Sequence, residues 1–150
     1  MLPDSGMLLA LVQGVFMYKL VDFIGIPFVN GGRDFTGCDC WGLVCLAYRH
    51  LFGTELEDYQ ISCFDTLRIK GQIEKEVKSA EIWKEINIPE IPCLVVMSTN
   101  PNFPRFCNHL GLYVEDQKFL HTFKKKDSVL ERFDHPFFKR KIQMYLKYIG

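Results

Sequence analysis

The chain has 150 residues, of which 48% are apolar and 14% aromatic. It is therefore long enough to bury the core of one ordinary domain, and this composition excludes an intrinsically disordered chain. The 18 basic and 18 acidic residues cancel, so bulk charge does not indicate a nucleic-acid partner. We expect a single domain over residues 1–150.

The N-terminal segment MLLALVQGVFM, residues 7–17, has the length of the apolar region of a signal peptide. However, Asp4 precedes it without any basic residue, and no Ala-x-Ala-like cleavage site follows. Eleven residues are also too few to span a bilayer. We therefore expect a chain made in the cytoplasm without a signal peptide or membrane span, whose six cysteines need not form disulfides.

Apolar periodicity predicts three helices, over residues 7–24, 40–52 and 66–80. The second helix has the clearest boundaries, because Asp39 is a good N-cap and Gly53 favours a left-handed C-terminal cap. The apolar positions expected to face the core are Leu8, Leu9, Val12, Phe16, Leu20 and Phe23 in the first helix, Leu43, Val44, Ala47, Tyr48 and Leu51 in the second, and Leu67, Ile73 and Val77 in the third.

The second half of the chain changes to short segments rich in β-branched and aromatic residues, separated by turn signals. These segments predict strands over residues 93–98, 109–114, 118–123 and 141–148. Helices followed by strands indicate the α+β class, with N-terminal helices packed on an antiparallel sheet.

Among the cysteines, Cys40 is the best candidate for chemistry. A thiol in the first helical turn lies at the positive end of the helix dipole, which favours thiolate and predicts a lowered pKa. Cys45, Cys63 and Cys93 are expected to be buried packing residues. Cys38 is expected to be a loop thiol.

A nucleophilic cysteine needs a base and a group that orients the base. Of the four histidines, His50 lies late in the helix that Cys40 begins, and His135 precedes a proline in a charged loop. Only His109 and His121 lie on predicted strands, and these strands are consecutive. The loop between them decides whether the two imidazoles share a face of the sheet.

Two loop lengths are possible for this hairpin. A two-residue turn at 116–117 would place Val114 opposite Phe119 and send His109 and His121 to opposite faces. The two histidines could then not interact.

A three-residue loop over 115–117 pairs Val114 with Lys118 and Gly111 with His121, which puts both histidines on one face. Gly111 then leaves room for the second imidazole ring. We predict this register, because it also gathers apolar residues on the opposite face. Those residues are Leu110, Leu112, Val114 and Leu120.

The segments GIPFVNGGRDFTGCDCWGLV and NHLGLYVEDQKFLHT resemble the NlpC/P60 family of papain-like cysteine peptidases. The pattern of that family is Gly-x-Pro-Tyr, then Asp-Cys-Ser-Gly-Leu-Val at a helix start, then His-x-Gly-Ile-Tyr on one strand and a His on the next. The resemblance covers residues 25–53 and 91–123 with the helix before them. Trp41 in place of Ser, with the preceding Gly-Arg-Asp, is most similar to a branch found among bacteriophage and prophage tail-assembly proteins.

The resemblance implies that Cys40 is the nucleophile, His109 the general base and His121 the residue that orients His109. The oxyanion would lie near the backbone N–H of Cys40, at the helix start capped by Asp39. The resemblance places the substrate cleft at four further residues and implies no cofactor or metal. They are Phe28, Arg33, Asp34 and Trp41.

The substrate implied by the resemblance is the stem peptide of peptidoglycan, often at a bond that follows D-glutamate. In a phage setting, the implied partners are other tail proteins, and the implied location is the virion tail acting on the cell wall. Two positions depart from the family pattern: Phe28 stands where a Tyr is frequent, and Cys93 where an Asp begins a strand. The first puts a substrate contact in doubt rather than the nucleophile.

Three alternatives remain open from the sequence. A zinc site could use Cys38, Cys40, Cys107 and His109, although structural zinc sites usually take Cys-x-x-Cys and this set leaves His121 without a task. A non-catalytic tail structural protein could use the same fold, although it would not require the intact cysteine and histidine set. An acyltransferase or amidase on the same scaffold is the related enzyme alternative.

Overall fold

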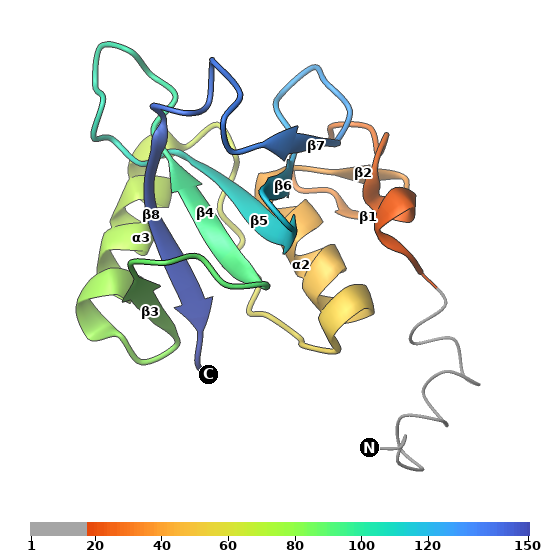
Figure 1. Ribbon diagram of the computed structural model, residues 1–150, viewed down its shortest axis with the longest axis horizontal. Coiled ribbons are helices and arrows are strands. Elements are labelled where there is room, and N and C mark those ends of the chain that lie inside the picture. The colour runs from red at the N-terminus through yellow and green to blue at the C-terminus, as the bar shows by residue number, and fades with distance from the viewer. Residues whose placement is uncertain (1–17) are drawn as a thin grey trace.

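The computed structural model describes residues 18–150. A six-stranded antiparallel sheet in the order β3-β8-β4-β5-β6-β7 forms its centre (Figure 1). The strands are β3 (Trp83–Ile86), β4 (Cys93–Met97), β5 (His109–Glu115), β6 (Lys118–His121), β7 (Val129–Arg132) and β8 (Ile142–Tyr148). A separate ribbon pairs β1 (Arg33–Asp34) with β2 (Gly37–Cys38).

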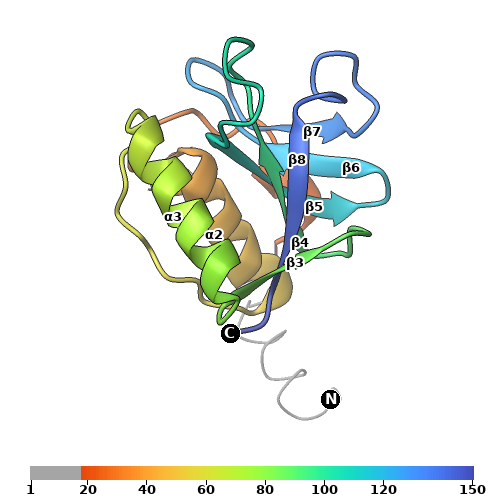
Figure 2. The ribbon, with the colours of Figure 1, turned by 90° about the vertical axis from the view of Figure 1, so that its left-hand side faces the viewer.

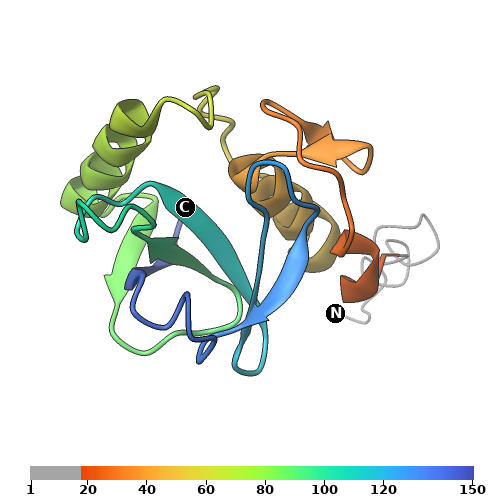
Figure 3. The same ribbon diagram turned by 90° about the horizontal axis from the view of Figure 1, so that it is seen from above.

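Two helices, α2 (Cys40–Phe52) and α3 (Thr66–Ser79), lie on the same face of the sheet (Figures 2 and 3). The buried apolar residues of α2 and α3 form one core with the inward side chains of the sheet. A smaller apolar cluster, which includes Phe119 and Phe138, covers the opposite face. The predicted α+β class, with helices packed on an antiparallel sheet, is confirmed.

The predicted boundaries of α2 are confirmed. Asp39 has extended backbone angles, and its carboxylate accepts a hydrogen bond from the backbone N–H of Gly42. At the other end, Gly53 has a φ of 64°, and its N–H donates to the carbonyl of Tyr48. Both caps satisfy backbone groups that the helix itself leaves free.

Helix α3 begins after Asp65, which caps it by accepting a hydrogen bond from Arg68 N–H. Its predicted extent is confirmed to within one residue, but the predicted burial of Leu67 is wrong, because this side chain is 73% exposed. The buried face instead runs through Ile69 and Ile73. Two residues correspond to about 200° around a helix, so Leu67 and Ile69 lie on opposite sides.

The part of the first predicted helix that falls in residues 18–24 is wrong. Only a four-residue 3-10 helix, η1 (Leu20–Phe23), forms there. The carboxylate of Asp22 accepts a hydrogen bond from the backbone N–H of Lys19, which closes the segment into a short turn. The rest of that prediction, over residues 7–17, lies outside the described residues.

All four predicted strands are confirmed, as β4, β5, β6 and β8. Strands β3 and β7 were not predicted, because each has four residues and carries charged side chains. Each is an edge strand, paired on one side only, so the apolar signal of a buried strand is missing. Within residues 18–150, no helix is long and apolar enough to cross a membrane.

Candidate active site

The first turn of α2 is anchored by Asp39, which is 1% exposed. Its Oδ1 accepts hydrogen bonds of 2.8 Å from Gly42 N–H and from Arg33 Nη1, and its Oδ2 accepts one of 2.8 Å from Gly31 N–H. The N-cap therefore also ties the preceding loop to the helix. As a result, Cys40, the next residue, is held in a fixed position at the helix start.

The loop and the helix also approach each other closely at two glycines. A Cβ at Gly42 would lie 1.9 Å from the carbonyl oxygen of Gly32, and a Cβ at Gly32 would lie 2.3 Å from that of Gly37. No side chain fits at such distances. Gly42 at the helix start and Gly32 in the preceding loop are thus required by backbone packing next to Cys40.

The Cys40 thiol is buried, with 8% of the residue exposed. Burial raises the pKa of this thiol to about 12, and the negative charge of Asp39 acts in the same direction, while the backbone N–H groups of Leu110 and Trp41 oppose the rise. The lowered pKa expected from the helix dipole is therefore wrong for the resting site. Burial raises the pKa of Cys40 more than the helix terminus lowers it, so Cys40 is a protonated thiol in the resting site.

The hairpin that carries the two histidines has a different loop from the one predicted. Glu115 pairs with Lys118 across a two-residue turn, and Val114 is the extra residue of a bulge, so the predicted pairing of Val114 with Lys118 is wrong. Beyond the bulge, Leu112 pairs with Leu120, which is the register that the three-residue loop predicted. One inserted residue moves every later side chain to the other face of the sheet, and the effect is the same for an insertion in the loop and for one in the strand.

This register brings the two imidazoles together. His109 Nε2 and His121 Nδ1 lie 2.9 Å apart in a hydrogen bond, with both residues buried. Gly111 leaves room mainly for the ring of Phe119 rather than, as was predicted, for the second imidazole ring: a Cβ there would lie 2.8 Å from the ring of Phe119 and 3.3 Å from the Cβ of His121. His109 also stacks on the ring of Phe123 at a centroid distance of 4.3 Å.

Both imidazoles are held neutral. Burial, and then the proximity of His121, lowers the pKa of His109 well below its ordinary value. Burial, and then the charge of His135, lowers the pKa of His121 to about 4. At neutral pH the site therefore contains a thiol and two neutral imidazoles.

The surroundings of His121 Nε2 indicate which nitrogen of each imidazole carries the proton. His121 Nε2 is buried and has no hydrogen-bond partner in residues 18–150, and Oε2 of Glu131 lies 3.8 Å from it. The carboxylate favours a proton on this nitrogen. His121 Nδ1 then accepts from His109 Nε2, and His109 Nδ1 keeps the lone pair that a base needs.

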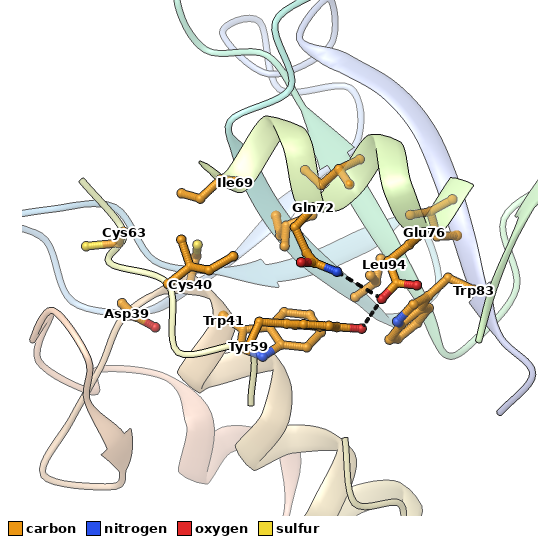
Figure 4. A pocket seen from close by; sticks show the side chains of 14 residues that line it. Asp39, Cys40, Trp41, Tyr59, Cys63, Ile69, Gln72, Glu76, Trp83 and Leu94 are labelled. Carbon is orange, nitrogen blue, oxygen red and sulfur yellow. Dashed lines mark hydrogen bonds between the residues drawn. The ribbon is translucent and has the colours of Figure 1, made fainter. Parts of the chain in front are cut away.

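Cys40 and His109 line one open cavity of about 510 Å³. Two of its other lining side chains are basic, Lys124 and Lys126. The rest of the lining mixes aromatic and small polar residues: Phe28, Cys63, Phe64, Thr66, Thr99, Asn108, Thr122 and Phe123. Cys40 also lines a second, apolar cavity between α2 and α3, together with Trp41 and Tyr59 (Figure 4).

The four predicted cleft residues divide into two pairs. Phe28 lines the open cavity and Trp41 lines the apolar one. Arg33 and Asp34 line neither. Arg33 instead bridges Asp39 and Asp58, and Asp34 accepts two hydrogen bonds from Thr36 within a turn.

The alternative zinc site is wrong. Cys38 Sγ donates to the carbonyl of Asp34, and Cys107 lines a separate cavity against α3. In the part of the chain that the structure describes, no group of three or more potential ligands could hold a metal ion. The four residues proposed as ligands therefore do not come together.

Several residues of the site could not be found from the sequence. Cys63 was expected to be a buried packing residue, but it is half-buried and lines both cavities beside Cys40. Cys93 is fully buried, as predicted. Glu131 lies on β7, which was not predicted as a strand. The sequence of β7, Val-Leu-Glu-Arg, has no apolar–polar alternation that could have suggested a strand.

The lowered histidine pKa values predict that stability falls in mild acid. A folded-state pKa of about 4 for His121, against an unfolded value of about 6.5, means that the unfolded chain binds the extra proton first as pH falls. The contribution is complete above about pH 6.5 and is lost towards pH 4, which amounts to about 2 kcal/mol between pH 7 and pH 5. Chemical denaturation across this range should show a shallower pH dependence in His121→Asn than in the unmodified protein, and equal slopes would contradict the assignment.

The fold, with Cys40 and the hydrogen-bonded histidine pair beside one cavity, defines the class of papain-like α+β proteins. Comparison with known proteins gives the family. The sequence pattern of the NlpC/P60 family matches residues 25–147. The chain belongs to the NlpC/P60 family. A search of the curated proteins finds no match.

Solved structures with the same fold share little sequence with this chain. The NlpC/p60 domain of the peptidoglycan hydrolase SagA is 16% identical with a TM-score of 0.54, and the match covers 92% of this chain and 96% of that domain. An NlpC/P60 family protein from Bacillus cereus is 16% identical with a TM-score of 0.59, over 85% of this chain and 37% of that one. NlpC1 from Trichomonas vaginalis is 17% identical with a TM-score of 0.56, over 91% and 42%. This chain thus spans about two fifths of the last two proteins.

Proposed function

We propose that the protein is a cysteine-type endopeptidase that hydrolyses an amide bond in the stem peptide of peptidoglycan. The observation that carries the proposal is the placement of Cys40 and His109 on one open cavity, with His109 hydrogen-bonded to the buried His121. A thiol, a neutral base and a group that orients the base are the parts that thiol hydrolysis requires.

The resting pKa values support attack with concerted proton transfer. Cys40 gives its proton to Nδ1 of His109 as its sulfur attacks the amide carbonyl, and the imidazolium then protonates the leaving amine. His121 accepts from His109 Nε2 throughout, which holds the ring in the productive orientation. Water then releases the acyl group from Cys40, with His109 again acting as base.

The charge of the open cavity supports a substrate with carboxylates. Lys124 and Lys126 line it together with Cys40 and His109, and cationic side chains favour the acidic groups of a stem peptide. Among the structural relatives, SagA is described as a peptidoglycan hydrolase. Membership of the NlpC/P60 family is consistent with the same substrate class.

A phage or prophage tail is the proposed setting. It is supported by the Gly-Arg-Asp segment 32–34 and by Trp41 after the nucleophile, a pattern similar to that of the tail-assembly branch. Arg33 and Gly32 both contact the cap of the Cys40 helix, so the segment has a structural task at the site. Mass spectrometry of purified tail particles should detect the chain, and its absence there would contradict this setting.

The decisive test of the activity uses purified protein and peptidoglycan fragments from several wall types. We expect new amine termini by mass spectrometry with the unmodified protein and none with Cys40→Ala. Fragments that stay intact with every wall type would support the alternative of a non-catalytic tail protein. Cleavage that persists in Cys40→Ala would show that another group is the nucleophile.

A further inference from the structure

A further cavity of about 380 Å³ adjoins the open cavity that holds Cys40 and His109. All of its lining residues fall within residues 121–138, which contain the end of β6, the edge strand β7 and the loops on either side of β7 (Figure 1). We call it the edge cavity. Its volume is within the range of small-ligand sites, about 300–1,000 Å³. Phe123 and Lys126 line both cavities, so one ligand can extend from the open cavity into the edge cavity.

A buried nitrogen without a hydrogen-bond partner lies at the edge cavity. His121 is 2% exposed and lines this cavity, and its Nε2 has no partner in residues 18–150. Oε2 of Glu131, which also lines the cavity, lies 3.8 Å away, too far for a direct hydrogen bond. A hydroxyl about 2.8 Å from both atoms can accept from Nε2–H and donate to the carboxylate. The gap between His121 and Glu131 therefore suits a hydroxyl group.

Phenylalanine rings form the apolar part of the edge cavity. Phe137 is 50% exposed, and its ring packs edge to face against Phe138 at a centroid distance of 4.8 Å. Phe138 in turn stacks on Phe123 at 5.5 Å. Exposed aromatic faces remove apolar ligand surface from water. The cavity therefore favours a ligand that has a flat apolar face in addition to hydroxyl groups.

The charges of the edge cavity favour a neutral ligand. Its lining includes both signs, with the ammonium of Lys126 and the carboxylates of Asp127 and Glu131. The open cavity instead has Lys124 and Lys126 and no carboxylate in its lining. Neither an anion nor a cation matches all three charged groups of the edge cavity. A neutral ligand that both donates and accepts hydrogen bonds matches each of them.

We propose that the edge cavity is a saccharide subsite, which binds the amino sugar to which a stem peptide is joined. The apolar face of the pyranose packs on Phe137, and one hydroxyl fills the gap between His121 Nε2 and the Glu131 carboxylate. A stem peptide begins at this sugar and spans at most about 3.6 Å per residue, so a bond held next to Cys40 lies within a few residues of the sugar. The assignment rests on the proposed function for the peptide in the open cavity.

Binding tests the subsite without any need for turnover. The probes are N-acetylmuramoyl methylamide, inorganic phosphate and methylammonium, titrated into the Cys40→Ala protein and followed by NMR. The saccharide should shift the backbone signals of Val129, Glu131 and Phe138 and bind at least about 10-fold more tightly than either ion, the effect expected for a hydrogen bond to a charged group. Equal affinities, tighter binding of either ion, or no binding of the saccharide would each overturn the proposal.

Two matched variants, each made in the Cys40→Ala protein, locate the bound saccharide. Phe137→Ala removes the exposed ring and should weaken saccharide binding by about 10-fold. Phe103→Ala removes a ring that is 60% exposed on the loop between β4 and β5 and lines a different cavity, and it should bind the saccharide like the parent. Equal affinity in the two variants would overturn the subsite. If Phe137→Ala fails to fold, the comparison of the three probes in the Cys40→Ala protein still decides.

A cleavage experiment distinguishes failure of this inference from failure of the proposed function. The same stem peptide, either free or joined to its amino sugar, is incubated with the unmodified protein. We expect kcat/KM to be about 10-fold higher for the sugar-linked peptide, and Phe137→Ala should bring this ratio towards one. Cleavage that depends on Cys40 but has equal kcat/KM for both substrates overturns the subsite and supports the activity. Saccharide binding without cleavage of either substrate supports the subsite and overturns the activity.

Discussion

Replacing Cys40 with Ala is expected to lower the rate of amide hydrolysis by at least about a thousandfold, because Cys40 is the group that we propose to form the acyl intermediate. The fold should persist, since the change removes one buried sulfur from a helix whose cap, Asp39, stays intact. Initial rates on peptidoglycan fragments, with circular dichroism to verify folding, measure both effects.

Cys45→Ala is the matched control for this change. Cys45 is as buried as Cys40, at 8% exposure, and lies in the same helix, but it lines neither cavity. We expect activity close to that of the unmodified protein and a loss of about 1 kcal/mol in the free energy of unfolding. Equal loss of activity in two folded variants would remove Cys40 from its role.

Replacing His109 with Gln is expected to lower kcat by about 100-fold to 10,000-fold, the usual contribution of a general base. Gln keeps most of the volume that stacks on Phe123 and can still donate towards His121, but it cannot accept the proton of Cys40. The rate of thiol alkylation at neutral pH should fall as well, because the same base assists both reactions.

His135→Gln is the control for the base. His135 is 41% exposed in its side chain and lies 3.6 Å from Glu131, outside the open cavity. Its loss should leave kcat within a few-fold of the parent value. A His109→Gln protein that keeps the parent kcat would show that proton transfer does not pass through His109.

Elements were predicted accurately where residues within the element determine its structure, and less accurately where contacts with distant segments do. Helix α2 was predicted to the residue, because its caps, Asp39 and Gly53, act through backbone groups only a few positions away. Strand β7 was missed because it is stabilised by pairing with β6, a contact that its own four residues do not encode. The burial of Leu67 was wrong because the face that α3 buries depends on the elements packed against it.

The hairpin that carries the two histidines was also predicted only in part. The sequence required an odd number of inserted residues to bring His109 and His121 to one face, and the structure has such an insertion, as a bulge at Val114 rather than as a longer loop. Side chains alternate between the faces of a strand every residue, so the need for an odd number of inserted residues can be inferred from the hairpin sequence alone. The place of the extra residue depends on the pairing of the whole hairpin.

The sequence alone thus determined the α+β class, the helix start that presents Cys40 and the histidines available to it, because each follows from caps, periodicity or spacing within a short segment. Only the tertiary structure decided the protonation of the site and the shape of its two cavities. The raised thiol pKa of Cys40 comes from burial. The contact of Glu131 with His121, and the apolar cavity lined by Cys40 and residues of α3, each join residues from separate elements. Burial and long-range packing are properties of the folded chain as a whole, so no local pattern carries them.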